Sequence, residues 1–95
     1  MTMEALLYKL AEDYNRRSEL VALNWEQVKE GTCDDGTLQW NRGLLNGTEE
    51  YLEMLAKEEN VKLMFDCREH DFGFDDWKRK LTYNTVFLDF SSRNR

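Results

Sequence analysis

The sequence predicts an α+β fold in which an antiparallel helical hairpin precedes a small antiparallel β-sheet. Three observations predict it: a seven-residue apolar repeat in the first third of the chain, a second such repeat after a turn-rich segment, and strict alternation after Asn60. With 95 residues, 41% of them hydrophobic and 13% aromatic, the chain suffices for one packed domain that spans residues 1–95.

The first element is a long amphipathic helix, expected from about residue 3 to residue 30. Its apolar column repeats every seven residues and consists of Leu7, Tyr14, Val21 and Val28, accompanied by Met3 and Leu10. Thr2 is placed to cap the N-terminus, and Gly31 stands where a helix-ending glycine is favoured. Both ends of this helix are therefore marked in the sequence.

Three large apolar side chains of this helix lie outside that column. A helical wheel places Tyr8, Leu20 and Leu23 well away from the seam. Apolar side chains at such positions need a second partner, which a four-helix arrangement of two copies would supply. We therefore expect a homo-oligomer, most simply a homodimer, with these three residues at its interface.

A second helix is expected from about residue 37 to residue 59. The residues that define it repeat every seven positions and are Leu38, Leu45 and Leu52. This phase persists across Asn46-Gly47, which favours one continuous helix. The alternative is a break at that dipeptide, with Thr48 capping a new helix.

The second helix also contains two glycines, Gly43 and Gly47, at the GxxxG spacing. The membrane meaning of this motif requires an apolar span, which the sequence around it does not provide. In a helix outside the membrane, the two glycines either permit close backbone approach or weaken the helix. The sequence leaves both alternatives open.

Two strands are expected after Asn60, over about residues 61–67 and 81–90. Apolar and polar residues alternate through the first, as in a half-buried strand. The second is rich in β-branched and aromatic residues, and its alternation changes phase near Asn84-Thr85, which predicts a bulge or a tight turn there.

Composition narrows the classes of partner. The 19 acidic residues exceed the 13 basic ones and give a formal charge of −6, which disfavours direct binding to nucleic acid or to an anionic membrane. A protein with a basic surface fits better. The N-terminal residues lack a signal-peptide pattern and the two cysteines form no dense framework, so we expect a cytoplasmic, reducing location and no cofactor.

One segment combines carboxylates with large aromatic side chains. Its members are Asp66, Glu69, Asp71, Phe72, Phe74, Asp75, Asp76 and Trp77. Aromatic residues anchor protein interfaces, and surrounding carboxylates steer a basic partner toward them. We therefore predict that this segment binds the partner, mostly as a loop.

Two possible metal sites compete with this interpretation. The helical segment Glu49, Glu50 and Glu53 resembles the first acidic element of the MazG-like nucleotide pyrophosphohydrolases, a resemblance that implies magnesium held by these carboxylates. The second acidic element of that family is not matched, and these glutamates lie opposite the leucine seam, as a solvated face does. The second possible site is a zinc site, because Cys67, His70 and Cys33 have side chains that bind zinc. Their spacing lacks the two close ligand pairs of a structural zinc site, so we expect ordinary thiols instead.

The sequence thus predicts a small acidic, non-catalytic protein-binding module, an inhibitor or adaptor that engages a basic surface of a larger protein. In size and charge it resembles the small acidic inhibitors that phages and other mobile elements encode. One alternative is a nucleotide-binding or magnesium-dependent pyrophosphohydrolase-like protein that uses Glu49, Glu50 and Glu53. Another is a structural oligomer subunit.

Overall fold

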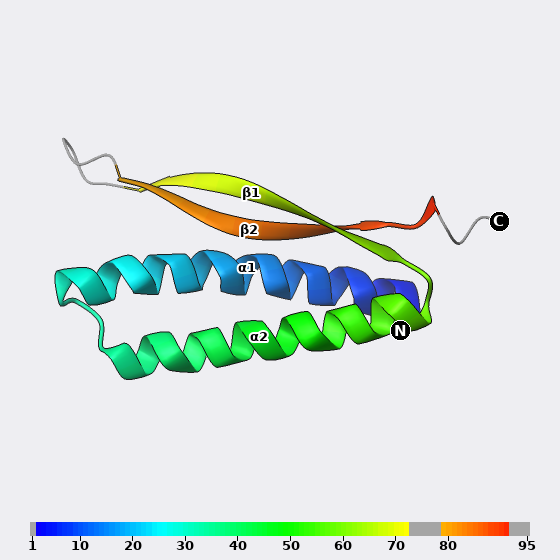
Figure 1. Ribbon diagram of the computed structural model, residues 1–95, viewed down its shortest axis with the longest axis horizontal. Helices are drawn as coiled ribbons and strands as arrows, with labels where there is room; N and C mark the ends of the chain where they lie inside the picture. Colours follow the sequence, from blue (N-terminus) through cyan, green and yellow to red (C-terminus); the bar gives the residue numbers. More distant parts are fainter. Residues whose placement is uncertain (1, 73–78, 92–95) are drawn as a thin grey trace.

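The computed structural model describes residues 2–72 and 79–91, with the backbone alone at 70–72 and 79–81. Two long helices lie side by side, and a two-stranded sheet runs along the first of them (Figure 1). In chain order the elements are α1 (Met3–Glu30), α2 (Asp35–Glu58), β1 (Lys62–Phe72) and β2 (Arg79–Asp89). The α+β prediction, with a helical hairpin before an antiparallel sheet, is confirmed.

Local chemistry explains where the helices begin and end. The Thr2 hydroxyl accepts the N–H of Ala5 at 3.0 Å, and Gly31 ends α1 with a left-handed φ of 80°. Both caps are those expected. Helix α2 begins two residues earlier than expected because Asp34 is its cap, accepting the N–H of Thr37 at 2.6 Å. Hydrogen bonds from Thr37 favour the ionised carboxylate of Asp34 and lower its pKa.

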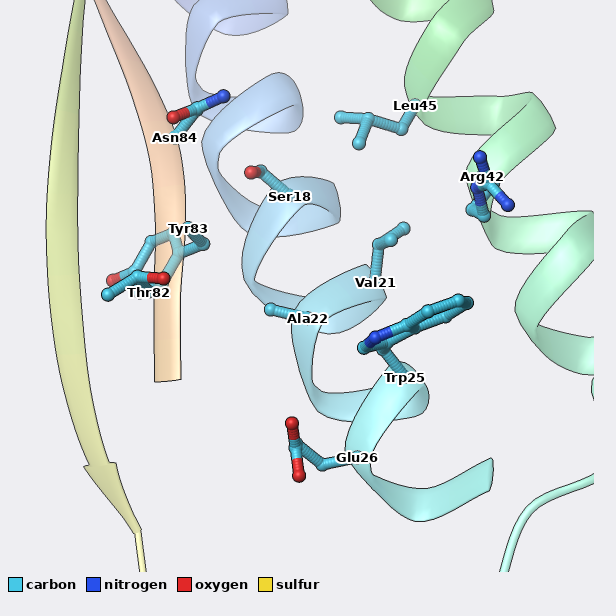
Figure 2. Close-up of a pocket in the computed structure, with 10 residues that line it drawn as sticks. All are labelled: Ser18, Val21, Ala22, Trp25, Glu26, Arg42, Leu45, Thr82, Tyr83 and Asn84. Carbon is cyan, nitrogen blue, oxygen red and sulfur yellow. The ribbon is translucent and has the colours of Figure 1, made fainter. Parts of the chain in front are cut away.

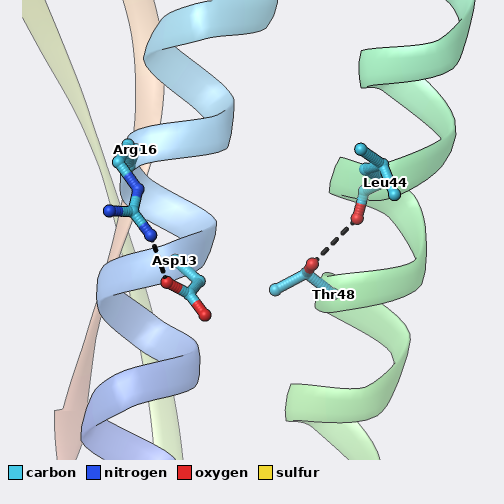
Figure 3. A network of polar contacts seen from close by, with 4 residues as sticks. All are labelled: Asp13, Arg16, Leu44 and Thr48. Carbon is cyan, nitrogen blue, oxygen red and sulfur yellow. Dashed lines mark hydrogen bonds and ion pairs between the residues drawn. The ribbon is translucent and has the colours of Figure 1, made fainter.

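Helix α2 continues unbroken through Asn46-Gly47. The Thr48 hydroxyl donates to the Leu44 carbonyl at 2.8 Å, a bond made inside a helix rather than at its start (Figure 3). The prediction of one continuous helix is therefore confirmed. Figure 3 also shows an ion pair on α1, in which Arg16 pairs with Asp13 at 2.6 Å.

The two strands pair without interruption from Lys62↔Asp89 to Phe72↔Arg79. The bulge or turn predicted at Asn84-Thr85 is therefore wrong. Successive residues point to opposite faces of a strand, yet Thr85 and Val86 are both buried. The apparent change of phase reflects burial on both faces of β2 and not an extra residue.

The first strand also extends to Phe72, five residues beyond its expected end at residue 67. Asp71 and Phe72 therefore belong to β1 and not to a loop. The alternation of apolar and polar residues that predicts this strand stops near Cys67. Hydrogen bonds between strand backbones do not require apolar side chains, so the strand can continue beyond that residue.

The core forms between α1, the C-terminal half of α2 and the start of the sheet. Its buried members are Leu7, Ala11, Tyr14, Leu52, Leu55, Ala56, Val61 and Val86. Asn60 adopts a left-handed φ of 55° between α2 and β1, where the chain changes direction. Each fully buried leucine contributes about 1.5–3 kcal/mol, so this cluster fixes how the sheet lies on the helices.

Candidate functional site

A hollow of about 410 Å³ is lined by residues from all four elements. We call it the acidic hollow, and its lining residues are Tyr14, Glu49, Phe65, Asp66, Cys67 and Asn84. The Phe65 ring packs edge-on against Tyr14 with the ring centroids 6.0 Å apart, and 47% of Phe65 stays exposed. The hollow therefore combines an accessible aromatic wall with two carboxylates.

No ion pair among the described side chains compensates the charge of the acidic hollow. Burial raises the pKa of Glu49, and the carboxylates of Glu53 and Glu50 raise it further. Within the described part of the chain the ion pairs are Asp13–Arg16 and Glu26–Lys29, and none involves these three glutamates. A cation that entered the hollow would relieve this repulsion.

Only part of the predicted partner-binding segment can be placed. Asp66 and Glu69 are exposed on β1, and Asp66 lines the acidic hollow, where its carboxylate accepts the N–H of Cys67 at 2.8 Å. Asp71 and Phe72 continue the strand, with their backbone alone described. The remaining members lie outside the described residues: Phe74, Asp75, Asp76 and Trp77.

The three glutamates of α2 do not share one environment. Glu50 and Glu53 are exposed, as a solvated face requires, whereas Glu49 is half-buried at the hollow. Among the described side chains, no group of three histidine, cysteine, aspartate or glutamate residues is arranged to hold a metal ion. The half-buried Cys33 and the exposed Cys67 are free thiols, and the side chain of His70 is outside the described set.

A second hollow, of about 490 Å³, lies along α1 between α2 and β2 (Figure 2). We call it the helix–strand groove; it is lined by Ser18, Val21, Ala22, Trp25, Glu26, Arg42, Leu45, Thr82, Tyr83 and Asn84. In Figure 2, Val21 and Leu45 point toward each other, and Trp25 extends toward α2. The small side chains of Ser18 and Ala22 leave room between α1 and β2. The groove thus offers mainly apolar contact area.

The residues predicted at an oligomer interface have mixed surroundings. Tyr8 and Leu20 are exposed and Leu23 is half-buried. Tyr8 has a partner within the chain, because its ring lies 5.4 Å from that of Phe90. A helical wheel cannot predict this contact, because it places only the residues of one helix and Phe90 comes from the other end of the sequence.

Comparison of the chain with protein-family models, with curated proteins and with solved structures gives no match. Neither helix in the described part of the chain has a stretch apolar enough to cross a lipid bilayer. The chemistry of the two hollows and of the exposed surfaces is therefore the basis for a function.

Proposed function

We propose that this chain is a small acidic, non-catalytic protein-binding module, an inhibitor or adaptor that engages a basic surface of a larger protein. The acidic hollow carries the proposal, because Glu49 and Asp66 line it together with Phe65, whose ring is half-exposed. A lysine or arginine side chain would place its charge at the carboxylates and its methylene stem along the ring. The aromatic wall would act as the anchor.

Charge supports a protein over other classes of partner. The formal charge of −6 repels nucleic acid and anionic membranes and attracts a basic protein at long range. The raised pKa of Glu49 adds a pH dependence, because a bound cation favours the ionised carboxylate. Over the acidic range in which Glu49 titrates, binding should therefore tighten as the pH rises. In size and charge the chain resembles the small acidic inhibitors that phages and other mobile elements encode, and we propose a cytoplasmic location for it.

The test uses a lysine- and arginine-rich peptide and two variants with the same change in net charge. One carries Glu49→Gln and Asp66→Asn in the hollow. The control carries Glu12→Gln and Glu58→Gln, which are exposed and do not line the hollow. We expect the hollow variant to bind about tenfold more weakly with a flatter salt dependence, and the control to bind like the parent. An equal loss in both variants would reduce the effect to net charge and contradict the proposal.

The pyrophosphohydrolase alternative has its own test. A ligand that binds the native state raises its stability, so magnesium at the α2 glutamates would raise the melting temperature of the chain. We expect no such rise, and we expect Glu50→Gln with Glu53→Gln to leave partner binding and fold intact. Magnesium-dependent stabilisation that this double variant abolishes would favour the alternative. We also propose that the chain works as a homodimer, because large apolar side chains of both helices are exposed.

A further inference from the structure

An apolar stripe runs along α2 outside the core. This α2 stripe consists of Trp40, Leu44, Gly47, Tyr51 and Met54. Its large members are exposed by 69% at Trp40, 37% at Leu44, 46% at Tyr51 and 50% at Met54. The intervals alternate between four and three residues, which is the repeat of a helix packed lengthwise against another helix. The core uses a different face of α2, which carries Leu38, Leu52 and Leu55.

Two glycines in the middle of α2, Gly43 and Gly47, make no close approach to another part of the chain. A Cβ atom added at Gly43 or Gly47 would meet nothing within 4 Å. Close backbone approach inside the chain, one of the two meanings of the GxxxG spacing, is therefore excluded at these positions. Each glycine costs about 1 kcal/mol of helix stability relative to alanine. A second helix lying on the α2 stripe would use the space that they leave.

We propose that the α2 stripe is the interface of a homodimer in which α2 packs antiparallel against the α2 of a second copy, with the twofold axis at Gly47. The two ends of the stripe are equidistant from this residue: Trp40 and Met54 lie seven positions before and after it. Antiparallel pairing therefore sets Trp40 against the partner's Met54, a favourable sulfur–aromatic contact. The same patch meets itself, as a twofold interface requires.

Charge fixes the antiparallel orientation. Residues 36–48 carry one cation, Arg42, and no carboxylate, whereas residues 49–59 carry five glutamates and one lysine. A parallel dimer would set the two acidic halves side by side. The antiparallel dimer sets each acidic half beside the half that carries no carboxylate and opposes the helix dipoles. This interface is separate from the acidic hollow and does not depend on the proposed partner.

Single cysteines test the geometry, in the full chain with Cys33→Ser and Cys67→Ser. A disulfide requires Cα atoms within about 7 Å, which the twofold axis provides only near position 47. We expect Gly47→Cys to cross-link to a second copy under mild oxidation, and Leu44→Cys and the exposed control Gln39→Cys to stay uncross-linked. Cross-linking at Leu44→Cys would indicate a parallel dimer, and absence of cross-linking at Gly47→Cys would overturn the proposal.

Sedimentation velocity tests the interface without cysteines. Tyr51→Glu should raise the dimer dissociation constant about 100-fold, because a carboxylate is buried poorly at an apolar contact. Phe87→Glu is the matched control, since this aromatic residue is 50% exposed on β2, and it should behave like the parent. A parent chain that stays monomeric at high micromolar concentration would overturn the proposal. Dissociation by Leu20→Glu with Leu23→Glu, and not by Tyr51→Glu, would move the interface to α1.

Discussion

Asn15 binds the backbone of Val86 through both the nitrogen and the oxygen of its side-chain amide. Its Nδ2 donates to the Val86 carbonyl at 3.0 Å, and the Val86 N–H donates to its Oδ1 at 2.6 Å. Along an antiparallel pair, backbone groups point alternately to the partner strand and to the outer edge. Those of Val86 point away from β1, so Asn15 satisfies a buried strand edge and joins it to α1.

Asn15→Ala should lower the free energy of unfolding by about 2–4 kcal/mol, because it leaves two buried backbone groups without a partner. Urea denaturation followed by circular dichroism measures this change. Asn46→Ala is the control, since Asn46 is exposed on α2, and its effect should stay within about 0.5 kcal/mol. Equal stabilities for the two variants would show that the Asn15 bonds contribute little.

A polar link also joins the two helices, and it leads to a prediction about coupling. Asn41 Nδ2 donates to Asn24 Oδ1 at 2.5 Å, and Asn24 Nδ2 donates to Gln27 Oε1 at 3.0 Å. Asn41→Ala should destabilise the fold by about 1–3 kcal/mol, because it leaves the side-chain oxygen of the buried Asn24 without its donor from α2. A double-mutant cycle with Asn24→Leu and Asn41→Leu should give a coupling energy above about 0.5 kcal/mol. Additive losses would mean that the two amides act independently.

Glu49→Gln should stabilise the chain at neutral pH. Burial and the neighbouring Glu53 and Glu50 raise the Glu49 pKa in the folded state, so the folded chain holds this proton more tightly than the unfolded chain. Stability is therefore lost as the pH rises from the unfolded pKa through the folded one. We expect a gain of about 0.5 kcal/mol or less at pH near 7.

Melting temperatures measured at two pH values check the prediction for Glu49. Well below its ordinary pKa of about 4.3, both states are protonated, and parent and variant should melt alike. Glu12→Gln, a change at an exposed glutamate, controls for net charge. A Glu49→Gln variant that melts below the parent at neutral pH would contradict the repulsion inferred at the hollow.

Two glycine substitutions should have opposite signs. Gly31→Ala should destabilise the chain by about 1 kcal/mol, because φ at this position is 80° and alanine is strained there. Gly43→Ala should stabilise the monomer by up to about 1 kcal/mol, since it lies in the interior of α2 with open space around it. Thermal denaturation at low protein concentration measures both. Equal signs would contradict the roles assigned to these residues.

Features that depend on neighbours in the sequence were predictable. Thr2 and Gly31 mark the two ends of α1 through contacts within one helical turn. The leucine repeat of α2 has the same period as the buried face of that helix. The extent of β1 was not predictable, because the apolar–polar alternation ends near Cys67 whereas the backbone pairing continues to Phe72. The face of β2 near Thr85 was misjudged because burial there comes from both sides of the strand.

The candidate site was predictable only in part. Asp66, which the sequence predicts to bind the partner, lines the acidic hollow, and its role in binding stays a prediction. Glu49 was assigned to a solvated face, since a helical wheel shows only which face opposes the apolar seam and not what crosses it. Tyr14, Glu49 and Phe65 meet once the sheet packs on the helices, which brings together residues distant in the sequence.

The proposed binding mode is tested most directly by NMR of the ¹⁵N-labelled full chain during titration with the lysine- and arginine-rich peptide. If the acidic hollow takes a basic side chain, the largest shift changes fall on the amides of Glu49, Phe65 and Asp66. Those of the exposed Glu12 and Glu58 then change little. Shift changes of equal size at all exposed carboxylates, or a maximum away from the hollow, would contradict it.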